Sequence, residues 1–420
     1  MSPRCRTRHS LSSNVAKLAC ALAFLNAGVA RAQGANPPNS INCGTNVSSP
    51  LWSKGAVFAD SSVLETRSGQ KVAAIWCVYL STAAIPDPYS PQGGWSDAQL
   101  AAGFTLDPGI EWARITPTTA VDTRIRFHVA QVDTGQTEHF KISTTIEHLG
   151  ASAWTEIAAH TIAASVRNDT VRFESAFVPM LASNMRWISA PLEFVRLDTG
   201  VVDPARAKEA SAFVLSLRNQ LGLSSRAGES VLYMYSRSGN GHKLLGFSTF
   251  PGAIDGFSSN TPMKFVFANV AAAGELYRHE LARVALMASP RKLDAQLNEA
   301  LASVLGGVGN NTWAEHVCTG RAAVLKFAGE RDLPALFAKP DATATATVML
   351  KIELPVFIEQ MVVDGGNTAL RKLISGNYDL TTRQAARASL AGVLGISFPT
   401  LMQRVSTRYS EKALAERCKN

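Results

Sequence analysis

Two neighbouring helical segments within residues 269–307 constrain this chain most, because they carry polar side chains that packing alone does not require. In the first segment, polar and apolar residues recur at spacings of three and four, which places them on one helix face. These residues are Leu276, His279, Glu280, Arg283 and Met287. Pro290 separates this segment from the second, residues 293–305, which carries Glu299 and ends at two glycines.

Residues 279–283 read HELAR and differ at one position from the zinc motif H-E-x-x-H. In that motif, two histidines four residues apart project from the same helix face and bind one metal ion, while the Glu polarises a water molecule. Arg283 stands where the second histidine would be. A guanidinium stays protonated and has no lone pair to donate, so this position has lost its metal ligand.

The order of strands, HELAR helix, loop and a second helix with NEALA resembles the gluzincin metallopeptidases, and most closely the peptidase MA-like family. The resemblance covers roughly residues 192–420. It implies that His279 corresponds to the first zinc ligand, Glu280 to the general base and Glu299 to the third ligand. It also implies two departures from the family, because Arg283 replaces the second ligand and Ala300 replaces the Gly of the family's N-E-G.

The resemblance further implies an α+β fold with a zincin-like domain and a helical C-terminal subdomain. In a working gluzincin, a Tyr or His from the tail region often stabilises the oxyanion. Between His316 and Tyr378 this chain has neither residue. If Arg283 contacts Glu280 or Glu299, its charge satisfies carboxylates that would otherwise surround a metal ion.

Three classes of function follow. The favoured hypothesis is a noncatalytic protein that keeps the gluzincin fold for binding or assembly with an unidentified protein or peptide, and it favours no cofactor. The alternative is an active secreted zinc peptidase with an unusual ligand set, in which His316 supplies the missing ligand. The third is a purely structural protein of the cell envelope, in which His279, Glu280 and Glu299 belong to a solvated helix face.

The N-terminal residues 1–32 are typical of a secretory signal peptide. Basic residues precede an apolar run at residues 18–30, and the sequence Ala30-Arg31-Ala32 offers a cleavage site. Removing the five basic residues of this segment lowers the formal net charge from +8 to +3, so nucleic-acid binding loses its main support. No later segment is apolar enough for an integral membrane helix. We therefore expect a periplasmic or secreted protein.

Four cysteines follow the predicted signal peptide, namely Cys43, Cys77, Cys318 and Cys418. An even number in an exported protein suggests two disulfides, for which three connectivities exist. Pairing Cys43 with Cys77 and Cys318 with Cys418 keeps each bond inside one half of the chain. The alternative is free, buried cysteine.

Residues 33–197 are predicted to form a β-rich domain with an antiparallel, β-sandwich-like arrangement. Its expected strands are residues 72–80, 124–132, 140–146, 171–177 and 192–195. A long loop is expected at residues 84–112, where Trp95 and Trp112 form either a ligand platform or a core edge. His128, His139, His148 and His160 lack a common ligand spacing, so each is interpreted as structural.

Residues 198–420 form the predicted zincin-like domain. Asp203, Pro204 and Gly222 delimit an amphipathic helix. Strands are expected at residues 230–236 and 263–268, and Asn269 is expected to cap the next helix. The remainder after Thr312 is predicted to be helical, with breaks at Pro334, Pro340, Gly365, Gly366, Gly376 and Gly395.

Overall fold

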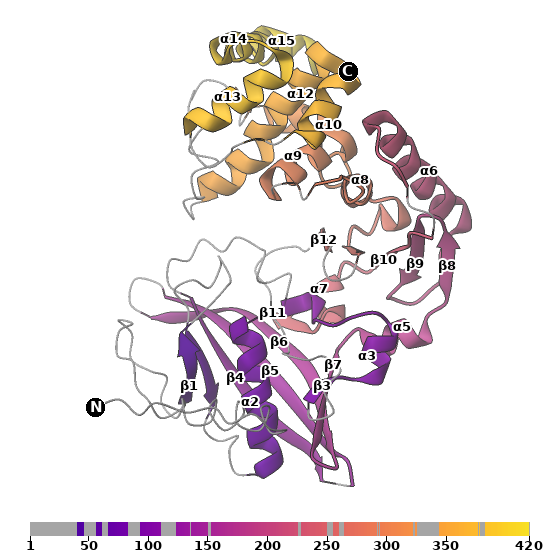
Figure 1. Cartoon of the computed structure of the whole chain (residues 1–420), viewed down its shortest axis with the longest axis vertical. Helices are drawn as coiled ribbons and strands as arrows, with labels where there is room; N and C mark the ends of the chain where they lie inside the picture. Colours follow the sequence, from indigo (N-terminus) through magenta and orange to yellow (C-terminus); the bar gives the residue numbers. More distant parts are fainter. Residues whose placement is uncertain are drawn as a thin grey trace, which may run out of the picture. The chain divides into compact units, whose positions relative to one another are not determined.

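The structure is a computed structural model of the chain in which helices and sheets are both extensive. It describes residues 40–45, 56–60, 66–82, 93–110, 123–134, 136–149, 153–225, 228–249, 255–259, 264–291, 293, 295–321, 324–325, 344–376, 378 and 383–419. The predicted signal peptide, residues 1–32, lies outside the described residues, as do Trp112, Pro334 and Pro340. The chain divides into two compact units (Figure 1).

The first unit contains residues 1–116, 120–176 and 246–251. Its described strands form one eight-stranded sheet in the order β1-β2-β4-β5-β6-β7-β3, with β11 paired to β6. The strands are β1 (Ser40–Thr45), β2 (Ala56–Asp60), β3 (Gly93–Trp95), β4 (Thr123–Thr134), β5 (Glu138–Leu149), β6 (Trp154–Arg167), β7 (Thr170–Ser175) and β11 (Phe247–Thr249). Strands β4 to β7 form an antiparallel meander, whereas β2 pairs with β4 and β3 pairs with β7 in parallel.

A helix covers this sheet where the sequence predicted a strand. Residues 72–80 belong to α2 (Arg67–Thr82), which packs against β1, β2, β4 and β6 (Figure 1). The indole of Trp76 donates a hydrogen bond to Thr144 on β5 at 3.1 Å. The strand prediction was wrong because this run is buried on nearly every side, so no polar face reveals the helical period. The predicted sandwich-like arrangement is also wrong, because the described strands of this unit share one sheet and a helix packs on that sheet.

The expected loop at residues 84–112 also contains regular structure, because it includes β3 and α3 (Asp97–Ala101). Trp95 is fully buried, its ring lies 5.4 Å from that of Tyr79, and its indole donates to the Thr105 carbonyl oxygen at 2.7 Å. It therefore belongs to the core and not to a ligand platform. His160 is also buried, with its Nε2 3.2 Å from Asp107 Oδ1.

The second unit contains residues 117–119, 177–245 and 252–420. Its five-stranded sheet has the order β12-β13-β10-β9-β8. The strands are β8 (Arg186–Ser189), β9 (Leu192–Arg196), β10 (Val231–Tyr235), β12 (Gly256–Ser259) and β13 (Phe265–Ala268). β10 runs parallel to β9 and β13, whereas β12 is antiparallel to β13. The units divide after residue 176 and not at 197, because β9 pairs with this second sheet.

The first helices of the second unit are short except for α6. They are α5 (Val178–Ser183), α6 (Pro204–Leu221), α7 (Gly241–Leu244) and the 3-10 turn η2 (Gly274–Leu276). The prediction for α6 is confirmed, since the Asp203 carboxylate accepts from the Ala205 backbone amide and Gly222 ends the helix in the left-handed conformation.

The helical part of this unit follows β13. It consists of α8 (Arg278–Leu286), α9 (Ala295–Gly306), α10 (Trp313–Thr319), α12 (Ala344–Ser375), α13 (Arg383–Leu394), α14 (Phe398–Arg408) and α15 (Glu411–Arg417). The predicted break at Gly365 and Gly366 is confirmed, because α12 is kinked at Gly366, whose φ of 55° and ψ of −146° are not helical. A shared core includes Leu301 of α9, Phe357 of α12 and Leu401 of α14. The predicted helical tail is thus present in the described residues.

Both predicted disulfides are formed, and each lies within one unit. Cys43 on β1 bonds Cys77 on α2, and Cys318 on α10 bonds Cys418 after α15. Their Cα atoms are 5.7 and 5.4 Å apart, which is normal for disulfides. No helix within the described ranges is both long and apolar enough to cross a bilayer.

Candidate functional site

Helix α8 is held on the second sheet by its apolar face. Leu281, Val284 and Ala285 are fully buried in the core cluster that also contains Val214 of α6 and Tyr233 of β10. The helix packs against α6, α9, β12 and β13. This burial fixes the opposite face, which carries the HELAR polar groups, in one orientation.

A buried carboxylate fixes the turn that leads into α8. Glu275 of η2 has no exposed surface and accepts hydrogen bonds from the Tyr235 hydroxyl at 2.6 Å and the Asp203 backbone amide at 2.9 Å. It also pairs with the Arg237 guanidinium. Burial alone would raise the pKa of Glu275, but these donors outweigh it and lower the pKa below the ordinary value.

The structure corrects the predicted start of this helix. Asn269 does not cap it, because its side chain accepts from the Gly241 backbone amide at 3.0 Å. Tyr277 is the residue at the helix N-terminus, and its backbone amide donates to the Tyr233 hydroxyl at 3.2 Å. Asparagine is a favoured N-cap residue, but here the Asn269 side chain is already used in a tertiary hydrogen bond to Gly241.

The side chain of His279, which belongs to α8, contacts the end of α9. It is 5% exposed, and its Nδ1 lies 2.8 Å from the Gly307 carbonyl oxygen. A carbonyl oxygen only accepts, so Nδ1 carries the proton. Nε2 lies 3.5 Å from Glu299 Oε1. Metal-ligating histidines commonly donate one ring N–H to a backbone carbonyl in this way, which leaves the other ring nitrogen for the metal ion.

Two glycines at the end of α9 permit this contact. A Cβ on Gly306 would lie 2.8 Å from the Cα of His279, which is too close for any side chain. Gly307 adopts a φ of 88°, a conformation that favours glycine, and presents its carbonyl oxygen to the imidazole. The sequence prediction treated these glycines only as a helix stop and missed their role at His279.

Arg283 joins the two helices through Glu299. Its Nη2 donates to Glu299 Oε2, and its Nε lies 3.7 Å from Glu280 Oε1. The Arg283 side chain is 19% exposed and that of Glu299 is 27% exposed, so solvent screens this pair only partly. The structure thus brings His279, Glu280, Arg283 and Glu299 together on facing surfaces of α8 and α9.

Glu280 is the most deeply buried carboxylate of this group. Its side chain is 2% exposed, and its Oε2 has no hydrogen-bond partner among the described residues. A Cβ on Gly256 would lie 3.0 Å from Glu280 Cγ, so the backbone of the edge strand β12 passes directly beside it. The Tyr277 ring lies beside the same position of Gly256. Burial, together with the negative charge of Glu280, raises the pKa of Tyr277.

The four side chains do not form a zinc site. The motif resemblance assigns three ligand positions, and of these only His279 and Glu299 carry a lone-pair donor. The guanidinium of Arg283 lies on Glu299, where its charge would oppose a metal ion. Across the described ranges, no group of three or more His, Cys, Asp or Glu is placed to hold a metal ion. His316 lies on α10 with its ring 5.7 Å from that of Trp313.

Compared with known proteins, the chain matches no protein-family model, and no curated protein has a significant sequence match to it. The resemblance to gluzincins therefore depends on the motif residues and on the helices and strands that carry them.

Proposed function

We propose that the second unit is a gluzincin-like pseudoenzyme, a metallopeptidase scaffold that binds a protein or peptide segment without cleaving it. The observation that carries this proposal is the ion pair between Arg283 and Glu299. It places a permanent cation on the carboxylate that would be the third zinc ligand, so the charge that a metal would supply is already provided by the chain.

The arrangement around α8 supports the scaffold part of the proposal. The helix with HELAR follows β13 in the chain and packs against β12 and β13, and the helix with Glu299 comes next. His279 keeps the orientation of a ligand histidine through Gly307, although its partner position is now an arginine. An orientation suited to a ligand is expected if the ancestral site was lost at one position.

The edge strand β12 supports the binding part. It ends the order of the second sheet in the described part of the chain and runs antiparallel to β13. An edge strand offers backbone amide and carbonyl groups to an extended segment, which can add to the sheet. β12 passes beside Glu280, so a bound segment would lie next to the HELAR group.

Export to an oxidising compartment is part of the same proposal. Two disulfides are formed in the described residues, and such bonds persist mainly outside reducing compartments. Together with the signal-like residues 1–32, they support a periplasmic or secreted location.

The test is metal analysis of the purified protein after incubation with zinc and removal of loosely bound ions. The wild type is expected to retain no stoichiometric zinc. Arg283→His supplies the missing ligand and is expected to retain about one zinc per chain. Arg278→His makes the same change on an exposed position of α8 and serves as the matched control, with no zinc expected.

Two further results bear on the proposal. Adding Glu299→Ala to Arg283→His is expected to remove the zinc, because Glu299 would then be a ligand. Stoichiometric zinc in the wild type that disappears in Glu299→Ala, together with chelator-sensitive peptide cleavage, would overturn the proposal in favour of an active peptidase. Failure of Arg283→His to gain zinc would contradict the gluzincin scaffold itself.

A further inference from the structure

A pocket lined by several charged side chains lies among the last helices of the second unit, in a part of the chain that the proposed function does not use. Its volume is about 820 Å³, and it is an open depression that leaves a bound group accessible to solvent. Side chains from α12, α14 and α15 line it. The polar ones are Gln360, Gln403, Arg404, Thr407, Arg408 and Arg417.

The charge of this pocket is unbalanced toward the cations. Glu359 accepts from Arg417 at 2.7 and 3.0 Å and from Arg408 at 3.2 Å. Asp364 accepts from Arg404 at 3.1 Å. Three guanidiniums at the pocket therefore face two carboxylates, and each guanidinium has five N–H donors, more than these pairs use. The excess favours an anion with several acceptor oxygens.

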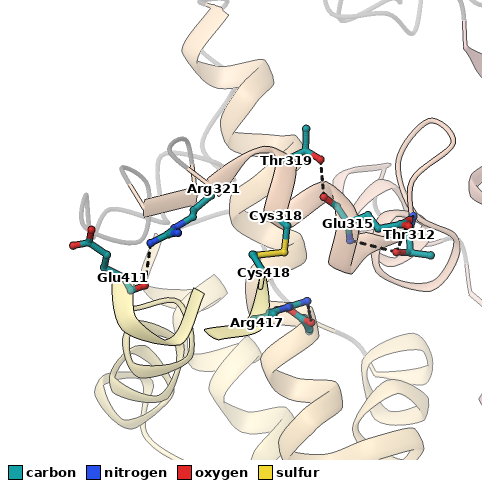
Figure 2. Close-up of a disulfide and its surroundings, with 9 residues drawn as sticks. Thr312, Glu315, Cys318, Thr319, Arg321, Glu411, Arg417 and Cys418 are labelled. Atoms are coloured by element: carbon teal, nitrogen blue, oxygen red, sulfur yellow. Dashed lines mark hydrogen bonds and ion pairs between the residues drawn. A yellow bond between two sulfur atoms is a disulfide. The ribbon is translucent and has the colours of Figure 1, made fainter. Parts of the chain in front are cut away.

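The arginines are held in place before any ligand arrives. Arg417 is followed directly by Cys418, whose disulfide to Cys318 ties the end of α15 to α10 (Figure 2). The pairing of Arg417 and Arg408 with Glu359 fixes α14 and α15 against α12. Guanidiniums fixed in this way lose little conformational entropy when they bind a ligand, so the pocket is preorganised.

Arg404 distinguishes a ligand site from a purely structural cluster. Its side chain is 46% exposed, and its pair with Asp364 lies at the surface, where such pairs add little stability. Arg408 and Arg417 are more buried and clamp helices together. Arg404 also bridges α14 to α12 through Asp364, but its exposed guanidinium lines the pocket, where an anion would contact it.

We propose that this pocket binds a small molecule through an oxyanion group, either a phosphate or a carboxylate. The three guanidiniums that line the pocket supply the charge-assisted hydrogen bonds to this group. The residues of the HELAR site do not line this pocket, so anion binding here is independent of whether that site binds zinc.

The test is calorimetric titration of the full chain with inorganic phosphate and, separately, with acetate in a chloride buffer of low ionic strength. We expect saturable binding of at least one anion, and the tighter of the two identifies the group that is recognised. Arg404→Gln is expected to weaken binding about tenfold, the loss of one charge-assisted hydrogen bond. Gln403→Ala, which removes a neutral lining group, is expected to weaken it by about threefold.

The matched control is Arg167→Gln, which removes one exposed positive charge from β6 in the other unit and is expected to leave binding unchanged. Circular dichroism establishes that each variant is folded, and the exposure of Arg404 and Gln403 makes misfolding a minor concern. Absence of saturable binding of either anion overturns the proposal. Equal affinity in the wild type, Arg404→Gln and Gln403→Ala overturns it as well.

Discussion

Single side chains in this protein act mainly by joining helices that are distant in sequence. Arg283 reaches from α8 to Glu299 on α9, and Glu359 on α12 receives Arg408, Tyr409 and Arg417 from the end of the chain. The motif left open whether Arg283 contacts Glu280 or Glu299, and in the structure its closest carboxylate contact is with Glu299. The Glu359 network carried no comparable signal, because its members have no motif spacing.

Glu359 provides a prediction at this scale. Burial alone would raise its pKa, but hydrogen bonds from Arg417 and Tyr409 outweigh burial and hold the pKa below the ordinary value of 4.5. Glu359→Gln leaves two arginines without their partner, so we expect the free energy of unfolding to fall by about 3 kcal/mol at pH 7. Urea denaturation of both proteins measures this difference.

The sign of the pH dependence follows from the lowered pKa. The stabilisation from Glu359 is complete above its ordinary pKa and is lost as the pH falls through the lowered folded value. The gap between wild type and Glu359→Gln should therefore shrink at acidic pH. Glu209→Gln, which affects a surface pair with Arg278, is the control and should change stability little. A gap that widens at low pH would refute this account of Glu359.

At the scale of whole elements, the approach of α8 and α9 determines the geometry of the candidate site. The two helices touch where Gly306 meets the backbone at Arg278 and His279. Helix α8 itself is short, and its apolar residues are buried in the core of the second sheet. The register between these helices, and so the distance from His279 to Glu299, depends on a glycine that the sequence pattern marked only as a terminus.

Gly306→Ala tests this contact. The added methyl group would overlap the backbone of α8, so we expect a loss of about 1–3 kcal/mol in the free energy of unfolding. We also expect weaker contact between the His279 imidazole and Gly307, visible as a changed imidazole signal in NMR spectra.

Gly392→Ala is the matched control, because Gly392 lies inside α13 and its Cβ would meet no atom within 4 Å. Alanine is the better helix former, so this variant should gain up to about 1 kcal/mol. If both substitutions stabilise the protein, the result contradicts a close contact between Gly306 and the backbone of α8.

The whole chain consists of two units that are interleaved in sequence. Residues 246–251, which include β11, return to the sheet of the first unit after the second has begun. In the described part of the chain, each unit contains one disulfide, and the two bonds close loops with sequence separations of 34 and 100 residues. A covalent link constrains the unfolded chain more when the loop is longer, so the second bond should contribute more to stability.

Replacing each cysteine pair by serine tests this division. Cys318→Ser with Cys418→Ser should reduce amide protection mainly in the helices of the second unit, and Cys43→Ser with Cys77→Ser mainly in the first. Loop closure predicts losses of about 3–5 kcal/mol for the longer loop. Hydrogen exchange measured by mass spectrometry locates the loss, and equal deprotection of both units by either pair would contradict the assignment.

The sequence alone determined those features that depend on local pattern. Capping residues and period placed α6, alternation placed β4 and β5, and HELAR with Glu299 marked the helices of the candidate site. Only the tertiary structure decided that residues 72–80 form a helix, that β9 joins the second sheet, and that Arg404, Arg408 and Arg417 share a pocket. The physical reason is that local pattern reports which face of a segment avoids water. The partner of that face is chosen by packing and charge pairing between segments that are distant in sequence.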